Sequence, residues 1–326
     1  MAGSASRAEN AVMSDFARTW PELVYEDLAP TVAYLNRMVQ VAGKYTLDEP
    51  FEVGWGNVVL DVTPRGLRTP TLRQPGVTFS VHYRLLDADV LIEADTGTRT
   101  LGLGDGTVAA FHSAFCAAAR DLGINPPGSS LLCEIPGAAA TFDADREHRR
   151  WDGEAAGIVW RAFELVAGGL ETWQAPYLGH RPRVGVMWGG FDLSATRYCG
   201  RPTLPRPNKP PFMQNGELQA YVSVGFSLGS ADAPAAAVYA YIWPQPDGLA
   251  GRGWGVEGAE WNPEAGLVLL PWSVLREQQD PHGAVVSFGE AVYRAAVELA
   301  DWPSNLIGPH CDGWHMSRTA PAETRD

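Results

Sequence analysis

The chain has 326 residues, of which 45% are hydrophobic and 10% aromatic, enough to fill the core of two ordinary domains or one large one. Its formal net charge is −13, and its 25 basic side chains are scattered along the sequence. Because binding to phosphates requires a concentrated basic face, we expect neither nucleic acid nor a membrane surface as a partner. The sequence contains no signal-peptide pattern and no apolar run of membrane-spanning length, which predicts a cytoplasmic protein.

The first part of the chain is predicted to contain a helix, several strands and a second helix. Apolar residues recur at helical spacing within 20–47, where Gly43 is placed to end the helix, and within 105–124, where Gly123 ends it. Between the two helices, turn-forming residues separate short runs of alternating or β-branched residues, a pattern that is typical of an antiparallel meander. The predicted strands are 51–63, 77–86, 89–94 and 98–103.

The second part repeats this order. A helix is predicted over 154–173, and a final helix opens at Ser287, because Ser287 and Glu290 have the spacing of a capping box. The strands between them are expected near 183–198, 218–228, 236–243 and 266–270.

Two stretches share the same pattern, "VGWGNVVLDVT" at 53–63 and "VMWGGFDLSAT" at 186–196. Trp55 therefore corresponds to Trp188, and a glycine followed by a cationic residue, Lys44 or His180, precedes each. We predict an α+β fold of two tandem helix–antiparallel-sheet–helix units, related by internal duplication and packed as one pseudo-twofold globule.

The predicted boundaries follow from composition. Residues 1–17 are expected to be disordered, 18–136 and 151–305 to form the two repeats, 137–150 to link them, and 306–326 to form a tail. The Pro-rich segment "CGRPTLPRPNKPPFMQNG" begins at Cys199. It either covers a site or is a poorly ordered loop.

The second Trp-Gly stretch also indicates where a ligand would bind. Side chains alternate along a strand, so one face carries Trp188, Asp192, Ser194, Thr196 and Tyr198, while Met187, Phe191, Leu193 and Ala195 lie on the core face. A carboxylate, hydroxyls and aromatic rings together are typical of a ligand-facing surface, which Trp55 would extend from the first copy. A plain solvated face is the alternative interpretation.

Three residues are candidates for catalysis. Lys44, one of only two lysines, and His180 occupy corresponding positions, and both residue types transfer protons or stabilise an anion. They could equally be surface cations that close helices. Asp192 is the only acid on the Trp188 face. We expect it to be buried, paired with a cation and next to the largest enclosed pocket, because an unpaired carboxylate is costly to bury.

Two arginines complete the predicted substrate-binding set. Arg197 and Arg201 flank Tyr198, and a guanidinium group can hold a substrate carboxylate through two hydrogen bonds. An ion pair of either arginine with Asp192 or another acid is the alternative. The complete set is Trp55, Trp188, Thr196, Arg197, Tyr198 and Arg201.

No cofactor or metal is predicted. The sequence lacks a phosphate-binding loop, a dinucleotide fingerprint, a nucleophile elbow and a His-Glu-x-x-His motif. Its four cysteines show no Cys-x-x-Cys pair, which predicts reduced thiols. The cluster His310, Cys311, Asp312 and His315 fits no zinc spacing.

Six segments of the sequence stand out together: "WPEL", "VAGKYTL", "EIP", "WGGFDLSATRYCGR", "VYAYIWPQPDG" and "LLPW". They resemble a bacterial family described only as a domain of unknown function, DUF5996. The likeness runs from about Trp20 to Trp302. It implies a shared fold and transfers no activity. The family pattern has Gly-Lys where this chain has Gly179-His180, and His-Glu where it has Gln219-Ala220. If the His-Glu pair serves the usual family reaction, its absence here implies recruitment to another reaction, in specialised metabolism.

Three functions are open at this point. The first is a cofactor-independent enzyme, a hydrolase, lyase or cyclase, that acts on a small molecule by acid–base chemistry. The second is a non-catalytic small-molecule-binding protein with a Trp-lined cleft. The third is a structural protein whose exposed tryptophans meet a partner chain. The sequence leaves the oligomeric state open.

Overall fold

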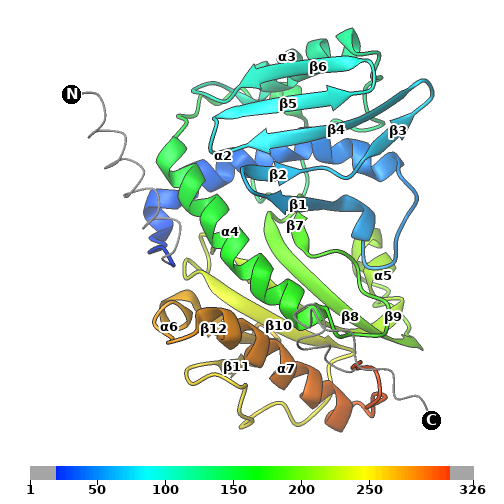
Figure 1. Cartoon of the computed structure of the whole chain (residues 1–326), viewed down its shortest axis with the longest axis vertical. Coiled ribbons are helices and arrows are strands. Elements are labelled where there is room, and N and C mark those ends of the chain that lie inside the picture. The colour runs from blue at the N-terminus through cyan, green and yellow to red at the C-terminus, as the bar shows by residue number, and fades with distance from the viewer. Residues whose placement is uncertain (1–19, 309–326) are drawn as a thin grey trace, which may run out of the picture.

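The computed structural model describes residues 20–308, which combine helices with antiparallel strands and so confirm the α+β class (Figure 1). The first half begins with α2 (Tyr25–Gly43) and the short 3-10 turns η1 (Lys44–Asp48) and η2 (Gly56–Val58). It ends with α3 (Val108–Asp121). The strands between are β1 (Val59–Thr63), β2 (Gly66–Arg68), β3 (Leu72–Gln74), β4 (Val77–Arg84), β5 (Asp89–Ala94) and β6 (Gly97–Gly102).

The second half also consists of a long helix, a run of strands and a closing helix. It opens with α4 (Gly153–Gln174) and closes with the short α6 (Trp272–Leu275) and α7 (Pro281–Leu299). The short helix α5 (Pro211–Gly216) interrupts its strands. These strands are β7 (Gly185–Met187), β8 (Asp192–Pro202), β9 (Gln219–Ser227), β10 (Ala237–Trp243), β11 (Glu260–Asn262) and β12 (Leu267–Pro271).

All described strands join one twelve-stranded sheet in the order β11-β12-β10-β9-β8-β7-β1-β2-β4-β5-β6, with β3 paired to β4. The two halves meet at the middle, where β1 pairs antiparallel with β7 through Val59 with Met187 and Leu60 with Val186. Each half therefore extends outward from its own first strand.

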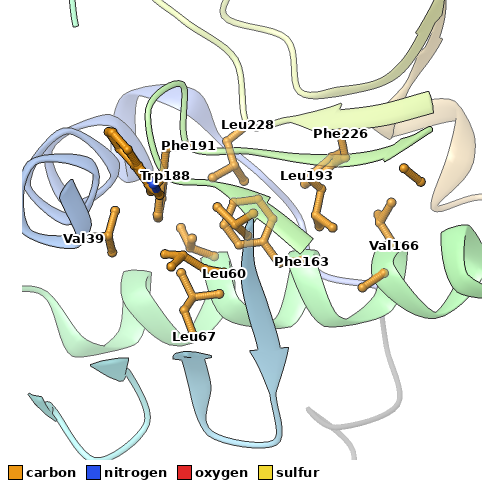
Figure 2. Packing of buried hydrophobic residues seen from close by; sticks show 14 of the residues in the cluster. Val39, Leu60, Leu67, Phe163, Val166, Trp188, Phe191, Leu193, Phe226 and Leu228 are labelled. Atoms are coloured by element: carbon orange, nitrogen blue, oxygen red, sulfur yellow. The ribbon is translucent and has the colours of Figure 1, made fainter. Parts of the chain in front are cut away.

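The core of the second half lies between the sheet and α4, which packs against β1, β8 and β9. Leu193 of β8 is paired with Phe226 of β9, so both side chains point to the same face of the sheet. Figure 2 shows them beside Phe163 of α4, whose ring centroid lies 6.1 Å from that of Phe226. Figure 2 also shows Trp188 at the edge of this cluster, near Val39 of α2.

Two of the three predicted helix ends are confirmed. Helix α2 ends at Gly43, and Gly123 follows α3 with a φ of 79°. The third prediction is wrong, because Ser287 lies inside α7. That helix begins at Pro281, where the side chain of Asp280 accepts a hydrogen bond from the backbone N–H of Gly283 at 3.0 Å. An aspartate at the N-cap position followed by a proline at the first helical position is a typical helix start.

The strand predicted over 183–198 is also corrected, because it is a hairpin. Strands β7 and β8 pair antiparallel, and the turn 188–191 joins them with Phe191 at a φ of 58°. The turn changes the phase of the alternation, so that Met187 lies opposite Asp192 and on its face rather than in the core. Trp55 likewise stands in a turn, with a φ of 61°, before β1.

The predicted N-terminal segment 1–17 and the cluster around Cys311 lie outside the described residues, as does most of the tail 306–326. The expected linker 137–150 contains the turn η3 (Phe142–Ala144), and Phe142 is buried in the core. None of the helices within 20–308 is apolar over enough of its length to cross a membrane.

Candidate functional site

A cavity of 860 Å³ opens on the face of the sheet opposite α4. Its floor consists of alternate side chains from three neighbouring strands, β8, β9 and β10. The strand register places these side chains in rows, because Thr196 is paired with Ser223 and Ser223 with Tyr241. The floor includes Asp192, Ser194, Thr196, Tyr198, Tyr221 and Tyr239. The predicted polar face of β8 is thus the floor of a cavity rather than a solvated surface.

A glycine explains how the floor is assembled around Asp192. Gly225 of β9 lies between Ser194 of β8 and Tyr239 of β10, and an added Cβ there would overlap the Tyr239 ring. Because this space is free, the tyrosine side chain crosses β9 and its hydroxyl donates a hydrogen bond to Asp192 Oδ2. The contact fixes the orientation of the carboxylate.

Asp192 has an unusual electrostatic environment. Burial raises the pKa of its carboxyl to about 6, the hydrogen bond from Tyr239 opposes this rise, and the nearby Glu134 carboxylate adds to it. We expected a cationic partner, but no ion pair joins Asp192 to a Lys, Arg or His between residues 20 and 308. Tyr239, a neutral donor, takes that place.

Glu134 is a second carboxyl group in the cavity, and the sequence analysis missed it. It stands in the segment between α3 and α4 with a φ of 59°, and its side chain lies over Gly189. The residue is exposed to solvent at the cavity, yet partial desolvation raises the pKa of Glu134, and the charge of Lys44 partly opposes this rise. Two signals in the sequence pointed to Glu134, a lone acid within the apolar stretch "LLCEIP" and the "EIP" segment of the family resemblance.

Lys44 is the buried cation of the site. It is 3% exposed, its Nζ lies 3.4 Å from Cys133 Sγ, and it sits 4.5 Å from the centroid of the Trp188 ring. Burial raises the pKa of the Cys133 thiol against the effect of Lys44, which keeps the thiol protonated near neutral pH. The indole N–H of Trp188 donates to Thr46 Oγ1 at 3.0 Å, which fixes the ring beneath the ammonium group.

The Pro-rich segment after Cys199 covers the cavity, as one of the two interpretations of its sequence proposed. Helix α5 contributes Phe212 and Met213 to the lining. The indole N–H of Trp55 donates to the backbone carbonyl of Phe212 at 2.6 Å and so ties this cover to the first half.

Three of the predicted site residues lie outside the cavity. His180 is exposed, with its Nε2 3.1 Å from the Val53 carbonyl, and Arg201 is exposed and donates to the Ala300 carbonyl at 3.1 Å. Arg197 is 0% exposed and lies on the helix-facing side of β8, where it pairs with Glu290 at 2.7 Å. The expected carboxylate clamp is corrected accordingly, because Arg197 alternates with the cavity residues and Arg201 lies beyond them.

The other six predicted residues line this one cavity, although they come from distant parts of the chain. They are Lys44, Trp55, Trp188, Asp192, Thr196 and Tyr198.

A second, more open groove of 840 Å³ runs beside β1, β2 and β4. Arginines gather there, although the sequence spreads them widely. Several are already paired with aspartates, as Asp61 is with both Arg68 and Arg183. Paired guanidinium groups and an open shape make this groove a weaker candidate for a small-molecule site.

The comparisons with known proteins agree with the resemblance in the sequence. No curated protein and no solved structure matches the chain. A family model described as a family of unknown function (DUF5996) matches residues 20–308, and the chain belongs to this family.

Proposed function

We propose that the protein is a cofactor-independent enzyme that performs acid–base chemistry on a small, partly apolar molecule. The observation that carries this proposal is the convergence of two carboxyl groups, Asp192 and Glu134, and a buried cation, Lys44, in one aromatic cavity. Pairs of ionisable groups in a partly desolvated pocket are the usual equipment for proton transfer. The reaction class would be hydrolysis, elimination or cyclisation.

Each group has a role that its surroundings support. Asp192, with a pKa of about 6, exchanges its proton near neutral pH and is oriented by Tyr239, so it acts as the general acid–base. Lys44 stabilises negative charge that develops on the substrate, because it is held in a site of low dielectric constant. Glu134 serves as the second proton carrier. Trp55 and Trp188 hold the apolar part of the substrate.

The aromatic lining also favours a second candidate, a non-catalytic small-molecule-binding protein. Exposed apolar residues would instead be needed for a partner-binding protein. Of the nine large apolar residues that are exposed between residues 20 and 308, three belong to the wall of the cavity, namely Leu47, Leu131 and Phe212. The cavity therefore gathers exposed apolar surface in a concave site, which supports a small-molecule ligand.

Isotope exchange separates catalysis from simple binding. The protein is incubated in D₂O with a mixture of bacterial metabolites, and mass spectrometry detects compounds that are consumed or gain deuterium. We expect at least one such compound, with the change abolished in Asp192→Asn and retained in Asp61→Asn, whose carboxylate lies outside the cavity. A compound that binds without reaction or exchange would favour the binding-protein alternative.

We also infer that the two halves arose by internal duplication. The shared order of elements supports this, as does the central antiparallel pairing of β1 with β7, which is where a pseudo-twofold axis would pass. In this arrangement β1 corresponds to β7, so Trp55 and Trp188 are not equivalent. Superposition of α2–β1–β2–β4–β5–β6–α3 on α4–β7–β8–β9–β10–β12–α7 tests the inference. Halves that superpose only with a different strand order would contradict it.

A further inference from the structure

The charged side chains that line the cavity do not sum to zero charge. Glu217 is paired with Arg206, whose Nε lies 2.8 Å from Glu217 Oε1. Lys44 makes no ion pair with Glu134, but its charge lowers the pKa of that carboxyl and so offsets the charge of Glu134. Within residues 20–308, the only hydrogen bond of Asp192 with another side chain is the one that it accepts from the neutral Tyr239 hydroxyl. Among these five charged residues, one carboxylate therefore lacks a positive counterpart.

Aromatic rings line the same cavity as this carboxylate, and one of them, Tyr239, contacts it. Tyr239 and Tyr241 stack along β10 with ring centroids 6.4 Å apart, and Tyr221 meets Tyr241 edge to face at 5.7 Å. Tyrosine faces attract cations through the ring quadrupole, and this attraction increases when the cation is desolvated. A carboxylate set among aromatic rings is suited to an organic cation.

An anionic ligand would be repelled here, because Asp192 and Glu134 lie close enough to influence each other. Lys44 does not reverse this preference, since its single positive charge is outnumbered by the two carboxylates, Asp192 and Glu134. A neutral ligand would leave the Asp192 carboxylate without a counter-charge. A protonated amine supplies that charge and satisfies both the carboxylate and the rings.

We propose that the cavity binds a protonated organic amine with an apolar body, its ammonium group against Asp192 and its body between the wall residues Trp55 and Trp188. This inference rests on the function proposed above and names the substrate class of the same cavity.

Isothermal titration calorimetry at about pH 8 tests the proposal with three probes of similar shape and different charge. The probes are phenethylamine, phenethyl alcohol and phenylpropanoate. We expect the amine to bind at least about tenfold more tightly than the alcohol, with the carboxylate weakest. Equal affinities for the three probes, or binding of none of them, would overturn the proposal.

Variants locate the effect. Asp192→Asn should weaken phenethylamine binding by at least about tenfold and leave the alcohol unchanged, because it removes charge and keeps shape. The control Asp61→Asn should affect neither probe. If thermal melting shows that Asp192→Asn is unfolded, the comparison of the three probes on the unaltered chain decides the matter alone.

The outcome is separable from that of the catalytic proposal. An amine that binds through Asp192 but shows no reaction or deuterium exchange would refute catalysis and retain this inference. A non-cationic compound that is turned over in an Asp192-dependent manner, while amines fail to bind, would refute this inference and retain catalysis.

Discussion

Tyr239 reaches Asp192 across an intervening strand, and the reason is the glycine at position 225 between them. The tyrosine belongs to β10 and the aspartate to β8, so their side chains would ordinarily be separated by a residue of β9. The absence of a Cβ turns two non-adjacent strands into one hydrogen-bonded unit on the cavity floor.

Gly225→Ala is expected to disrupt this unit. The new methyl group would overlap the Tyr239 ring and the Leu193 carbonyl, so the free energy of unfolding should fall by about 1–3 kcal/mol. Urea denaturation measures the change. Gly104→Ala is the matched control, because a Cβ there meets nothing within 4 Å, and it should change stability by less than about 0.5 kcal/mol. Equal effects of the two substitutions would contradict the packing described.

Asp192 should make the protein less stable as the pH rises from about 4 to about 6. The carboxyl has a pKa of about 6 when folded against an ordinary value of 3.8, so in this interval the folded state binds more protons than the unfolded state. Tyr239 and Tyr241 of β10 face this group, as does Glu134, whose raised pKa acts in the same direction. The full cost is present at pH 7.

Asp192→Asn removes this cost. Relative to the unaltered chain, the variant should gain at most about 3 kcal/mol at pH 7 and almost nothing at pH 4. Chemical denaturation at a series of pH values measures the difference. A variant that is less stable at pH 7 would indicate that a cation does pair with Asp192.

Trp55→Phe should loosen the cover of the cavity. The substitution keeps an aromatic ring but removes the indole N–H that donates to the Phe212 carbonyl. A hydrogen bond contributes about 1 kcal/mol, so amide hydrogen exchange in α5 should accelerate up to about fivefold. Trp160→Phe is the control, because it removes a similar bond, to the Thr63 carbonyl at 2.8 Å, away from the cavity. Unchanged exchange in α5 would show that Trp55 does not hold it.

Arg197→Ala should destabilise the fold without altering the cavity. The guanidinium group is buried on the opposite side of β8, 4.1 Å from the Trp173 ring centroid, and pairs with Glu290. Its removal should cost about 3–5 kcal/mol, because a buried ion pair is broken and a void is left. Phenethylamine affinity should be unchanged at temperatures where the variant is folded. A large loss of affinity would return Arg197 to the binding site.

The spacing of apolar residues predicted the helices and strands that have a clear pattern in the local sequence. Helix α4 and strand β5 lie almost where the apolar spacing placed them, and the alternation along β8 correctly assigned Leu193 to the core and Thr196 to the other face. The hairpin at 188–191 was missed because "WGGF" continues the alternating pattern. Its two glycines were nevertheless a turn signal.

The rest of the site depends on contacts between distant segments. Glu134 enters the cavity through a loop with a positive φ, and Tyr239 reaches Asp192 only because β10 lies two strands from β8. Neither relationship has a local pattern in the sequence. The central junction of β1 with β7 is equally non-local, because it pairs residues 59–60 with residues 186–187. Its ladder has only two paired positions.

Because so few backbone pairs join the two halves, a ligand in the cavity can add to the stability of the whole fold. Lys44 and Glu134 precede α4 in the chain, whereas Asp192 and Tyr239 belong to β8 and β10 of the second half. A ligand that contacts residues from both sets therefore binds only while the two halves are packed together. Such linkage adds RT ln(1 + [L]/Kd) to the free energy of unfolding, about 2.7 kcal/mol at a ligand concentration a hundred times Kd. The melting temperature of the whole chain is therefore a direct reporter of cavity occupancy, and it requires no knowledge of the reaction.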